Sequence, residues 1–332
     1  MINLLDLQPN KVTTNLNGYP FVFMAESGDG KTYTLNKVLK EIADEDKVPL
    51  FLMFEDRYQH IPNIMALRVK SVPELMSLMS QLRNPALKNK FSSIVIDTAD
   101  KLDGMIEKYQ ATSKEVEITG DLNFGKGNKY IKSTLYFITE LRNMGWTVHF
   151  AIQANKNTNI ITQKTSYECK VNKELWGLIS HDAYLVGFLS KEEGVDPKVA
   201  KRYLTFKKCE QFPQLKDSIG MPEVVEAGKF KETLAQAILS IDGAEFTEED
   251  TINHVLEEID FEKVKARGME LGQLLAQNNR LDEAMNILKT HLGMAEDGKT
   301  VKMFDSLLPA QAELAQVVVI KLEELAKKYS LI

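Results

Sequence analysis

The chain has 332 residues, of which 44% are hydrophobic, so it is long enough for one large domain and a smaller one. No apolar run approaches the roughly 18 residues that span a bilayer, and the first residues lack the basic and then apolar layout of a secretory signal. Two cysteines, Cys169 and Cys209, argue against a disulfide framework or a zinc site. These features predict a cytoplasmic protein with no membrane contact.

The net charge of −6 is unevenly distributed along the chain. From Ala244 to the end, 10 Lys and Arg residues stand against 17 Asp and Glu residues, whereas the preceding part is nearly neutral. Within that neutral part, the stretch from Lys108 to Lys173 holds ten basic and five acidic residues. The chain therefore combines an acidic C-terminal part with a locally basic stretch.

Short apolar runs alternate with helical patterns through the first two thirds of the chain. Each run is almost continuously apolar, as is typical of strands that are covered on both faces. Between the runs, apolar residues recur at helical spacing, as at Leu35, Val38 and Leu39. This alternation predicts an α/β fold with a mostly parallel central sheet. The expected strands are 21–25, 49–54, 93–97 and 148–153.

Beyond these elements, runs at 183–190 and 202–208 flank a turn-rich segment and predict an added hairpin. From Thr247 onward only helical patterns remain, and we place a domain boundary near 243–247. The C-terminal part is expected to form a small all-α module. The predicted domains are 1–243 and 244–332, and the predicted C-terminal helices are 261–277, 281–292 and 308–328.

The segment from Ala25 to Thr32 has the setting of a phosphate-binding loop, because it follows an apolar strand and opens an amphipathic helix. It matches G-x-x-x-x-G-K-[ST] except at Ala25, whose methyl is tolerated if that residue has a negative φ. Gly28 and Gly30 let backbone N–H groups converge on phosphates, and Lys31 reaches the β- and γ-phosphates. The predicted cofactors are ATP and Mg²⁺. The predicted cofactor-binding residues are Ser27, Gly28, Asp29, Gly30, Lys31, Thr32 and Tyr33, with Thr32 as a Mg²⁺ ligand.

A second nucleotide motif is "FSSIVIDTAD", whose Asp97 would hold Mg²⁺ at the carboxyl edge of the sheet. Ring ATPases of the AAA+ type usually place a catalytic Glu directly after this Asp, where this chain has Thr98. RecA-like ATPases carry the water-activating Glu at the end of another strand, and here Glu55 follows an apolar run, with Asp56 as a competing carboxylate. Gln153 closes a later strand, where RecA-like ATPases place a sensor of the γ-phosphate. The predicted catalytic residues are Glu55, Lys31 and Gln153.

Several stretches together resemble the phage-type RecA-like AAA ATPases, a group that includes phage single-strand annealing proteins. They are "SGDGKT", "FEDRYQHIPNI", "SSIVIDTAD", "NFGKGNKYIKSTLYFITELRNMGWTVHFAIQANK" and "KRYLTFKK…GMP", and the resemblance covers about residues 15–240. The most specific parts are the Gly-Lys-Gly segment before a long helix and the polar residue that closes the next strand. The resemblance implies a RecA-like P-loop core and ATP hydrolysis linked to single-stranded DNA in phage recombination or replication.

RecA-like ATPases contact DNA through loops that follow the third and fourth strands, and the resemblance therefore indicates two segments. One is 112–129, and the other is 155–173, which is too long and polar for a plain connector. Lysines neutralise phosphates and an aromatic ring can stack on a base, although a solvated lysine-rich loop is an open alternative. The predicted DNA-binding residues are Lys126, Lys129, Lys156, Lys164, Tyr167, Lys170 and Lys173.

The sequence therefore predicts a DNA-stimulated ATPase that assembles in a ring or filament with ATP between subunits. A cation from the neighbouring subunit would complete the site, and the candidates are Lys207, Lys208 and Lys216. The expected partners are single-stranded DNA, further copies of the chain, and a single-strand binding protein or other phage recombination or replication proteins. Two alternatives stay open: an ATP-driven helicase loader or accessory, and a nucleotide-switch adaptor that acts through protein contacts.

Overall fold

Two compact units make up the chain, Met1–His254 and Val255–Ile332. The structure is a computed structural model. It describes residues 9, 11–44, 46–56, 58–112, 129–192, 194–195, 200–248, 260–294 and 300–332.

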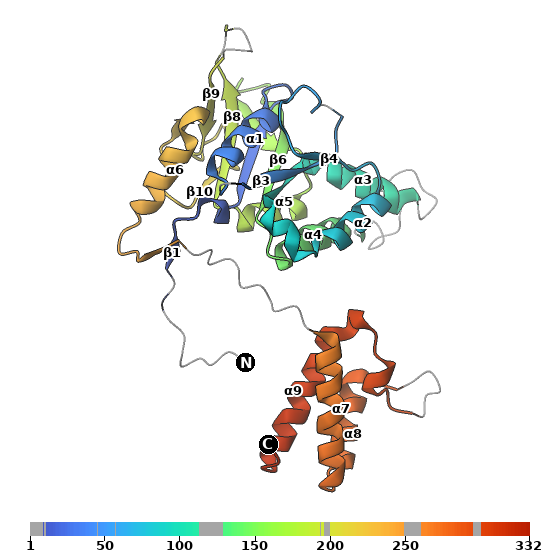
Figure 1. Cartoon of the computed structure of the whole chain (residues 1–332). Coiled ribbons are helices and arrows are strands. Elements are labelled where there is room, and N and C mark those ends of the chain that lie inside the picture. Colours follow the sequence, from blue (N-terminus) through green and yellow to red (C-terminus); the bar gives the residue numbers. More distant parts are fainter. Residues whose placement is uncertain are drawn as a thin grey trace. The chain divides into compact units, whose positions relative to one another are not determined.

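A large twisted sheet forms the centre of the first unit (Figure 1). Its strands lie in the order β11, β9, β8, β2, β6, β5, β3 and β4. Neighbouring strands are parallel from β8 to β4, whereas β9 and β11 are antiparallel to their neighbours. The prediction of a mixed α/β fold with a mostly parallel sheet is therefore confirmed. The bounds are β2 Phe21–Ala25, β3 Val48–Met53, β4 Ala66–Arg68, β5 Phe91–Asp97, β6 Val148–Thr158, β8 Leu185–Lys191, β9 Arg202–Thr205 and β11 Val224–Glu226.

Helices cover both faces of this sheet, so its apolar strands are buried on both sides. Helices α1 and α6 pack on one face, and helices α2 to α5 pack on the other (Figure 1). Every residue of β2 is buried, which accounts for the continuous apolar run in the sequence. The helices are α1 Lys31–Ile42, α2 Val72–Leu82, α3 Ala99–Thr112, α4 Lys129–Asn143, α5 Lys173–Asp182 and α6 Phe230–Leu239, with short 3-10 turns at Leu16–Gly18, Pro85–Asn89 and Ala227–Lys229.

The predicted hairpin at 183–208 is present as β8 and β9, but β8 also belongs to the main sheet. Strand β8 pairs in parallel with β2 on one side and antiparallel with β9 on the other. A two-residue strand, β10 Lys216–Asp217, adds to β8. The hairpin therefore extends the sheet beside the strand that leads into the phosphate loop.

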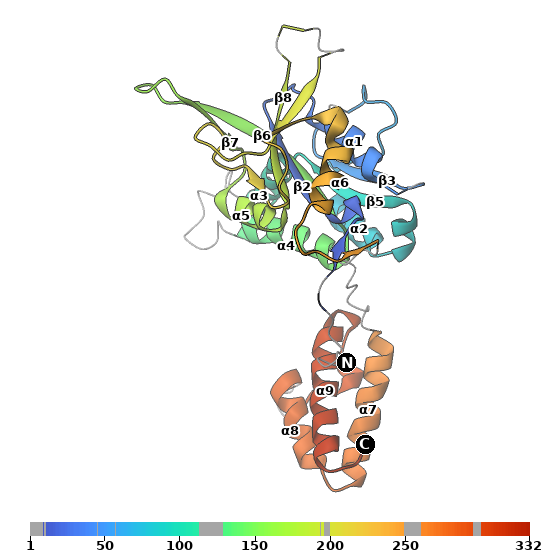
Figure 2. The same ribbon diagram turned by 90° about the vertical axis from the view of Figure 1, so that its left-hand side faces the viewer.

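The segment 155–173, expected as an open loop, is mostly a β-ribbon. Strand β6 continues to Thr158 and pairs antiparallel with β7 Thr165–Cys169. Figure 2 shows this ribbon running out from the sheet. The β6 part of the ribbon is exposed from Asn155 to Thr158, whereas in β7 only Glu168 is exposed.

The first unit extends beyond the boundary expected at 243. Strand β1 Val12–Thr13 pairs in parallel with β12 Phe246–Thr247, which ties residues after Gly243 to the start of the chain. The division between the two units falls after His254. Sequence character alone could not place this boundary, because a two-residue strand leaves no periodic pattern.

The second unit contains helices α7 Phe261–Gln277, α8 Leu281–Leu292 and α9 Ala312–Lys328 around a core of its own. These bounds match the predicted helices, except that the last is preceded by a 3-10 turn at Pro309–Gln311. Asp260 begins α7 by accepting a hydrogen bond from the Lys263 N–H at 3.1 Å. A further 3-10 turn lies at Phe304–Ser306. In the described parts of both units, no helix is long and apolar enough to cross a membrane.

Candidate nucleotide-binding site

The phosphate loop lies between β2 and α1, as the sequence predicts. Ala25 is the last residue of β2 and pairs with Gln153 of β6, and its φ is not positive, so its methyl is compatible with the backbone. Gly28 and Gly30 have φ values of +94° and +87°, which L side chains rarely adopt. At Gly30 a Cβ atom would also lie 2.8 Å from Arg202 Nε. Glycine is therefore required at both positions.

Lys31 is the first residue of α1, and its ammonium turns back over the start of the loop. It donates hydrogen bonds to the carbonyl oxygens of Ala25 at 3.1 Å and Glu26 at 3.0 Å. Burial lowers the pKa of this ammonium, and nearby carboxylates oppose that shift. In decreasing order of effect, these are Asp97, Asp100, Glu55 and Asp29. Four carboxylates near the phosphate loop thus raise the pKa of Lys31 and favour its charged form.

Asp97 ends β5 and is almost fully buried, with only 2% of its surface exposed. Burial raises the pKa of its carboxyl to about 6, while a hydrogen bond from the Thr32 hydroxyl and the charge of Lys31 lower it. Its Oδ2 atom has no hydrogen-bond partner in the described part of the chain. A buried carboxylate oxygen beside a threonine hydroxyl is the kind of oxygen donor pair that suits Mg²⁺. Thr32 and Asp97 therefore fit the predicted metal site.

Glu55 and Asp56, the two competing carboxylates, have different surroundings. Glu55 is half-buried, and its Oε1 accepts a hydrogen bond from the Thr98 hydroxyl at 3.4 Å, one residue beyond Asp97. Asp56 is exposed and forms an ion pair with Arg68. Glu55 is thus the carboxylate next to Asp97, and it is the better placed of the two to orient an attacking water.

Gln153 lies on β6, the strand between β2, which leads into the phosphate loop, and β5, which ends at Asp97. It pairs with Ala25 of β2, and Ala151, two residues earlier on β6, pairs with Asp97 of β5. The backbone N–H of Gln153 donates to Asp100 Oδ1 at 3.2 Å. The structure therefore brings Lys31, Thr32, Asp97, Glu55 and Gln153 to one edge of the sheet, where ligands of open α/β sheets bind.

Three charged residues near this site were missed in the sequence. Asp100 was hidden in the first turn of α3, three residues after Asp97. Lys191 and Arg202 lie on the β8–β9 hairpin, far from the loop in sequence. Lys191 Nζ lies 3.5 Å from Asp29 Oδ1, and Arg202 Nε donates to the Asp29 carbonyl at 3.4 Å. The Arg202 guanidinium also lies 5.0 Å from the centre of the Tyr33 ring.

The predicted DNA-binding residues do not form a single group. Lys126 lies outside the described residues, and the position of the Lys129 side chain is likewise not described. On the β6–β7 ribbon and just beyond it, Lys156, Lys170 and Lys173 are exposed. Lys164 is exposed but forms an ion pair with Glu210 at 2.6 Å.

Tyr167 packs within the first unit instead of standing free. Its ring centre lies 4.7 Å from that of Phe188 and 5.6 Å from that of Phe212, and the side chain is half-buried. This packing corrects the expectation of a ring that is free to stack on a base. An aromatic residue among lysines in the sequence can either stack on a base or pack in the core. The sequence does not show which, because the packing of Tyr167 depends on the pairing of β7 with β6.

Two of the three lysines predicted to act in a neighbouring subunit have contacts within their own chain. Lys207 pairs with Glu223 at 3.0 Å, and Lys216 donates to the carbonyl oxygens of Ser180 and His181 at the end of α5. Lys208 is exposed. Their predicted role in trans stays a prediction.

Comparison with known proteins agrees with this geometry. The family model of the AAA domain matches residues 17–214, which include the phosphate loop, Glu55, Asp97 and Gln153. The chain is also 25% identical over 307 residues to the SPbeta prophage-derived uncharacterized protein YorG of Bacillus subtilis (strain 168). That alignment covers 88% of this chain and 90% of the relative. Because the family model spans more than half of its length, the chain belongs to the AAA domain family of P-loop ATPases.

Proposed function

We propose that this protein hydrolyses ATP and binds single-stranded DNA, and that it promotes phage recombination, annealing or replication-linked DNA transactions. The observation that carries the ATPase part is the convergence of Lys31, Thr32, Asp97 and Glu55 at one sheet edge. The N–H groups of the loop and Lys31 would hold the β- and γ-phosphates, and Thr32 and Asp97 would hold Mg²⁺. Bound Mg²⁺ supplies positive charge to the transferring phosphoryl group.

In this arrangement, Glu55 orients the water that attacks the γ-phosphate. Its carboxylate is kept beside the site by the Thr98 hydroxyl at 3.4 Å. Gln153 lies between the loop strand and the Asp97 strand, so its amide can respond to the γ-phosphate. Glu55 follows β3, whereas Asp97 ends β5 and Gln153 lies on β6, and this supports the RecA-like arrangement of the catalytic residues over an arrangement with adjacent carboxylates.

The DNA-binding part rests on the exposed lysines that follow Gln153. Lys156, Lys170 and Lys173 are exposed on and beyond the β6–β7 ribbon, which begins at the strand that carries the proposed sensor. Lysines of this kind neutralise phosphates without sequence preference. The prophage origin of the relative in Bacillus subtilis supports a phage setting.

One observation favours the alternative of a helicase loader or nucleotide-switch adaptor. Tyr167 packs against aromatic neighbours and Lys164 pairs with Glu210, so two of the predicted DNA-binding side chains are already engaged within the chain. A protein that acts through protein contacts would not need them to be free. This alternative predicts hydrolysis that is indifferent to DNA.

The test is the rate of ATP hydrolysis with and without single-stranded DNA across a series of salt concentrations. We expect DNA to raise the rate at low salt and the stimulation to fade as salt rises, because phosphate contacts release counterions. The Lys31→Ala protein is the control, since it loses the charge that holds the β- and γ-phosphates and should show no turnover. A wild-type rate that DNA never changes would favour the loader or the adaptor.

A further inference from the structure

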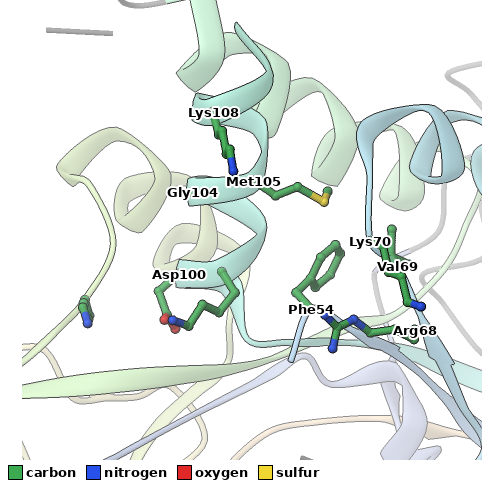
Figure 3. A pocket seen from close by; sticks show the side chains of 10 residues that line it. Phe54, Arg68, Val69, Lys70, Asp100, Gly104, Met105 and Lys108 are labelled. Carbon is green, nitrogen blue, oxygen red and sulfur yellow. The ribbon is translucent and has the colours of Figure 1, made fainter. Parts of the chain in front are cut away.

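An open pocket of about 430 Å³ lies beside the nucleotide site, between helix α3 and the end of β4 (Figure 3). Five cationic side chains and one carboxylate line it: Arg68, Lys70, Lys101, Lys108, Lys170 and Asp100. Figure 3 shows Lys108 and Asp100 on α3, opposite Arg68 at the end of β4 and Lys70 just beyond it. The volume is within the range of roughly 300–1,000 Å³ that is typical of ligand sites.

The charges of this pocket are mostly uncompensated. Arg68 pairs with Asp56, but its buried Nε has no hydrogen-bond partner among the described residues. The four lysine side chains are exposed, and none forms an ion pair within the described part of the chain. Like charges that gather around one concavity repel one another and raise the local potential, so the pocket attracts an anion.

The floor of the pocket is apolar. Phe54, which directly follows β3, is 8% exposed and lines the pocket together with the half-buried Met105 of α3. Phe54 and Met105 make this floor apolar, but Phe54 belongs to the buried core and offers no free ring face for stacking. A ring of cations over an apolar floor matches a nucleotide segment, whose phosphates are charged and whose bases have apolar faces. A bare inorganic anion would make no use of the apolar floor. A duplex would keep its bases stacked inside, out of reach of this floor.

The pocket is connected to the proposed γ-phosphate sensor through the backbone. Asp100, which lines the pocket, accepts a hydrogen bond from the Gln153 N–H at 3.2 Å. Lys170, which also lines the pocket, donates its backbone N–H to the Gln153 carbonyl at 2.8 Å. Both hydrogen-bonding groups of the Gln153 backbone are therefore held by residues of the pocket. A ligand that shifts either residue also shifts Gln153.

We propose that this pocket binds the backbone of single-stranded DNA, with phosphates on its lysines and a base over its apolar floor, and that its occupancy stimulates ATP hydrolysis through Gln153. The inference rests on the proposed function, and it assigns the site at which DNA acts. Three of the residues, Lys70, Lys101 and Lys108, lie outside both segments that the sequence indicated for DNA contact.

The test compares the wild type with two triple variants in the full chain. One changes Lys70, Lys101 and Lys108 to Gln in the pocket, and the matched control changes Lys229, Lys231 and Lys289, which are exposed elsewhere, to Gln. Binding of fluorescein-labelled oligodeoxythymidylate is followed by anisotropy across a salt series. We expect the pocket variant to bind at least tenfold more weakly at low salt, with a salt slope smaller by about 2. Its basal ATPase rate should persist while stimulation by DNA is lost, and the control should match the wild type.

The outcomes separate this inference from the proposed function. If the wild type binds the oligonucleotide and the pocket variant keeps the same affinity, salt slope and stimulation, the pocket is not the DNA site, although the proposed function stands. If the wild type shows no binding and no stimulation at low salt, the proposed function and this inference both fail. Tighter wild-type binding to oligouridylate than to oligodeoxythymidylate would overturn the assignment of the ligand as DNA.

Discussion

Among single residues, Asp97 shows how burial and function are balanced in this site. Its carboxyl has a pKa raised to about 6 by burial, and the hydroxyl of Thr32 and the charge of Lys31 counteract that rise. Glu55 and Asp100 raise the pKa further, since their charges repel a second carboxylate. A cation held by Asp97 and Thr32 would relieve this repulsion.

The roles of the neighbouring carboxylates can be tested by single substitutions. We expect Glu55→Gln to keep ATP binding and to slow hydrolysis by roughly a hundredfold or more, because a positioned base is lost. Asp56→Asn is the matched control, since Asp56 is exposed and pairs with Arg68. Single-turnover ATP hydrolysis and nucleotide binding are measured for both proteins. If the Asp56→Asn protein hydrolyses ATP slowly while the Glu55→Gln protein hydrolyses it at the normal rate, Asp56 and not Glu55 is the residue that orients the attacking water.

His149 provides a pH test that does not involve the nucleotide. It is fully buried in β6, and its Nδ1 accepts a hydrogen bond from the Phe21 N–H at 3.1 Å. Burial lowers the pKa of its imidazole from 6.5 to about 3. Between pH 6.5 and about pH 3, His149 is protonated in the unfolded chain but stays neutral in the folded chain. His149 therefore lowers the unfolding free energy progressively as pH falls through this range.

We therefore expect the unfolding free energy of the wild type, relative to that of His149→Gln, to fall by about 2 kcal/mol between pH 7 and pH 5. The measured quantity is the difference in unfolding free energy between the two proteins. The raised pKa of Asp97 increases the unfolding free energy as pH falls, but this effect is common to both proteins and cancels in the difference. Denaturant unfolding of the first unit at several pH values measures this difference. In parallel, the NMR signal of the His149 ring should stay at its neutral position from pH 8 to pH 5. A ring that titrates in that range would contradict the burial argument.

Among the secondary-structure elements, those with a strong local pattern were predictable. Strand β2 and residues 94–96 of β5 are continuously apolar because both faces of the sheet are covered, and α7 and α8 have the bounds that their apolar spacing indicates. The sequence predicts a loop where the β6–β7 ribbon lies, because the mostly polar residues of these strands show no apolar pattern. Its pairing depends on residues that face each other across a turn.

The contacts of the β8–β9 hairpin with the phosphate loop were beyond prediction for another reason. Arg202 and Asp29 are 173 positions apart in the sequence, and their contact depends on β8 lying next to β2 in the sheet. Nothing in the residues around Arg202 indicates that neighbour. The chemistry of the phosphate loop could thus be predicted from its local motif, whereas the cations that lie over it could not.

A substitution of Arg202 tests whether the β8–β9 hairpin contributes to nucleotide binding. We expect Arg202→Gln to weaken ATP binding by roughly tenfold or more, because a charge-assisted contact near the phosphates is worth about 1.5–3 kcal/mol. The matched control is Lys201→Gln, since Lys201 precedes Arg202 and pairs with Glu226. Isothermal titration with a non-hydrolysable ATP analogue measures both affinities. Equal losses in the two variants would mean that the hairpin contributes only general positive charge.

In the whole molecule, the two units have separate cores. The apolar residues of the first unit gather on the two faces of the sheet, and those of α7, α8 and α9 form a cluster of their own. The predicted nucleotide site lies entirely within the first unit, as does the region matched by the AAA domain model. The described helices of the second unit lie in the part of the chain for which the sequence predicts helices, whereas the first unit extends past residue 243, since the pairing of β1 with β12 joins two segments more than two hundred residues apart.

The boundary between the two units can be tested with fragments of the chain. A fragment of residues 1–254 should bind ATP as the full chain does, and a fragment of residues 255–332 should be helical by circular dichroism, because each keeps its core. A fragment of residues 1–243 is the matched control. It loses β12, including the hydrogen bonds that Val12 N–H and Thr14 N–H donate to the carbonyls of Glu245 and Thr247, each at 2.8 Å.

At about 0.5–1.5 kcal/mol for each hydrogen bond, the shorter fragment should be less stable than residues 1–254 by about 1–3 kcal/mol. Urea unfolding of the two fragments, followed by tryptophan fluorescence, measures this difference. If both fragments have the same urea midpoint, residues 244–254 do not stabilise the first unit, and the domain boundary lies near residue 243 as the sequence predicts. Loss of ATP binding from residues 1–254 would instead show that the helical unit takes part in the nucleotide site, because no residue of that site is removed with it.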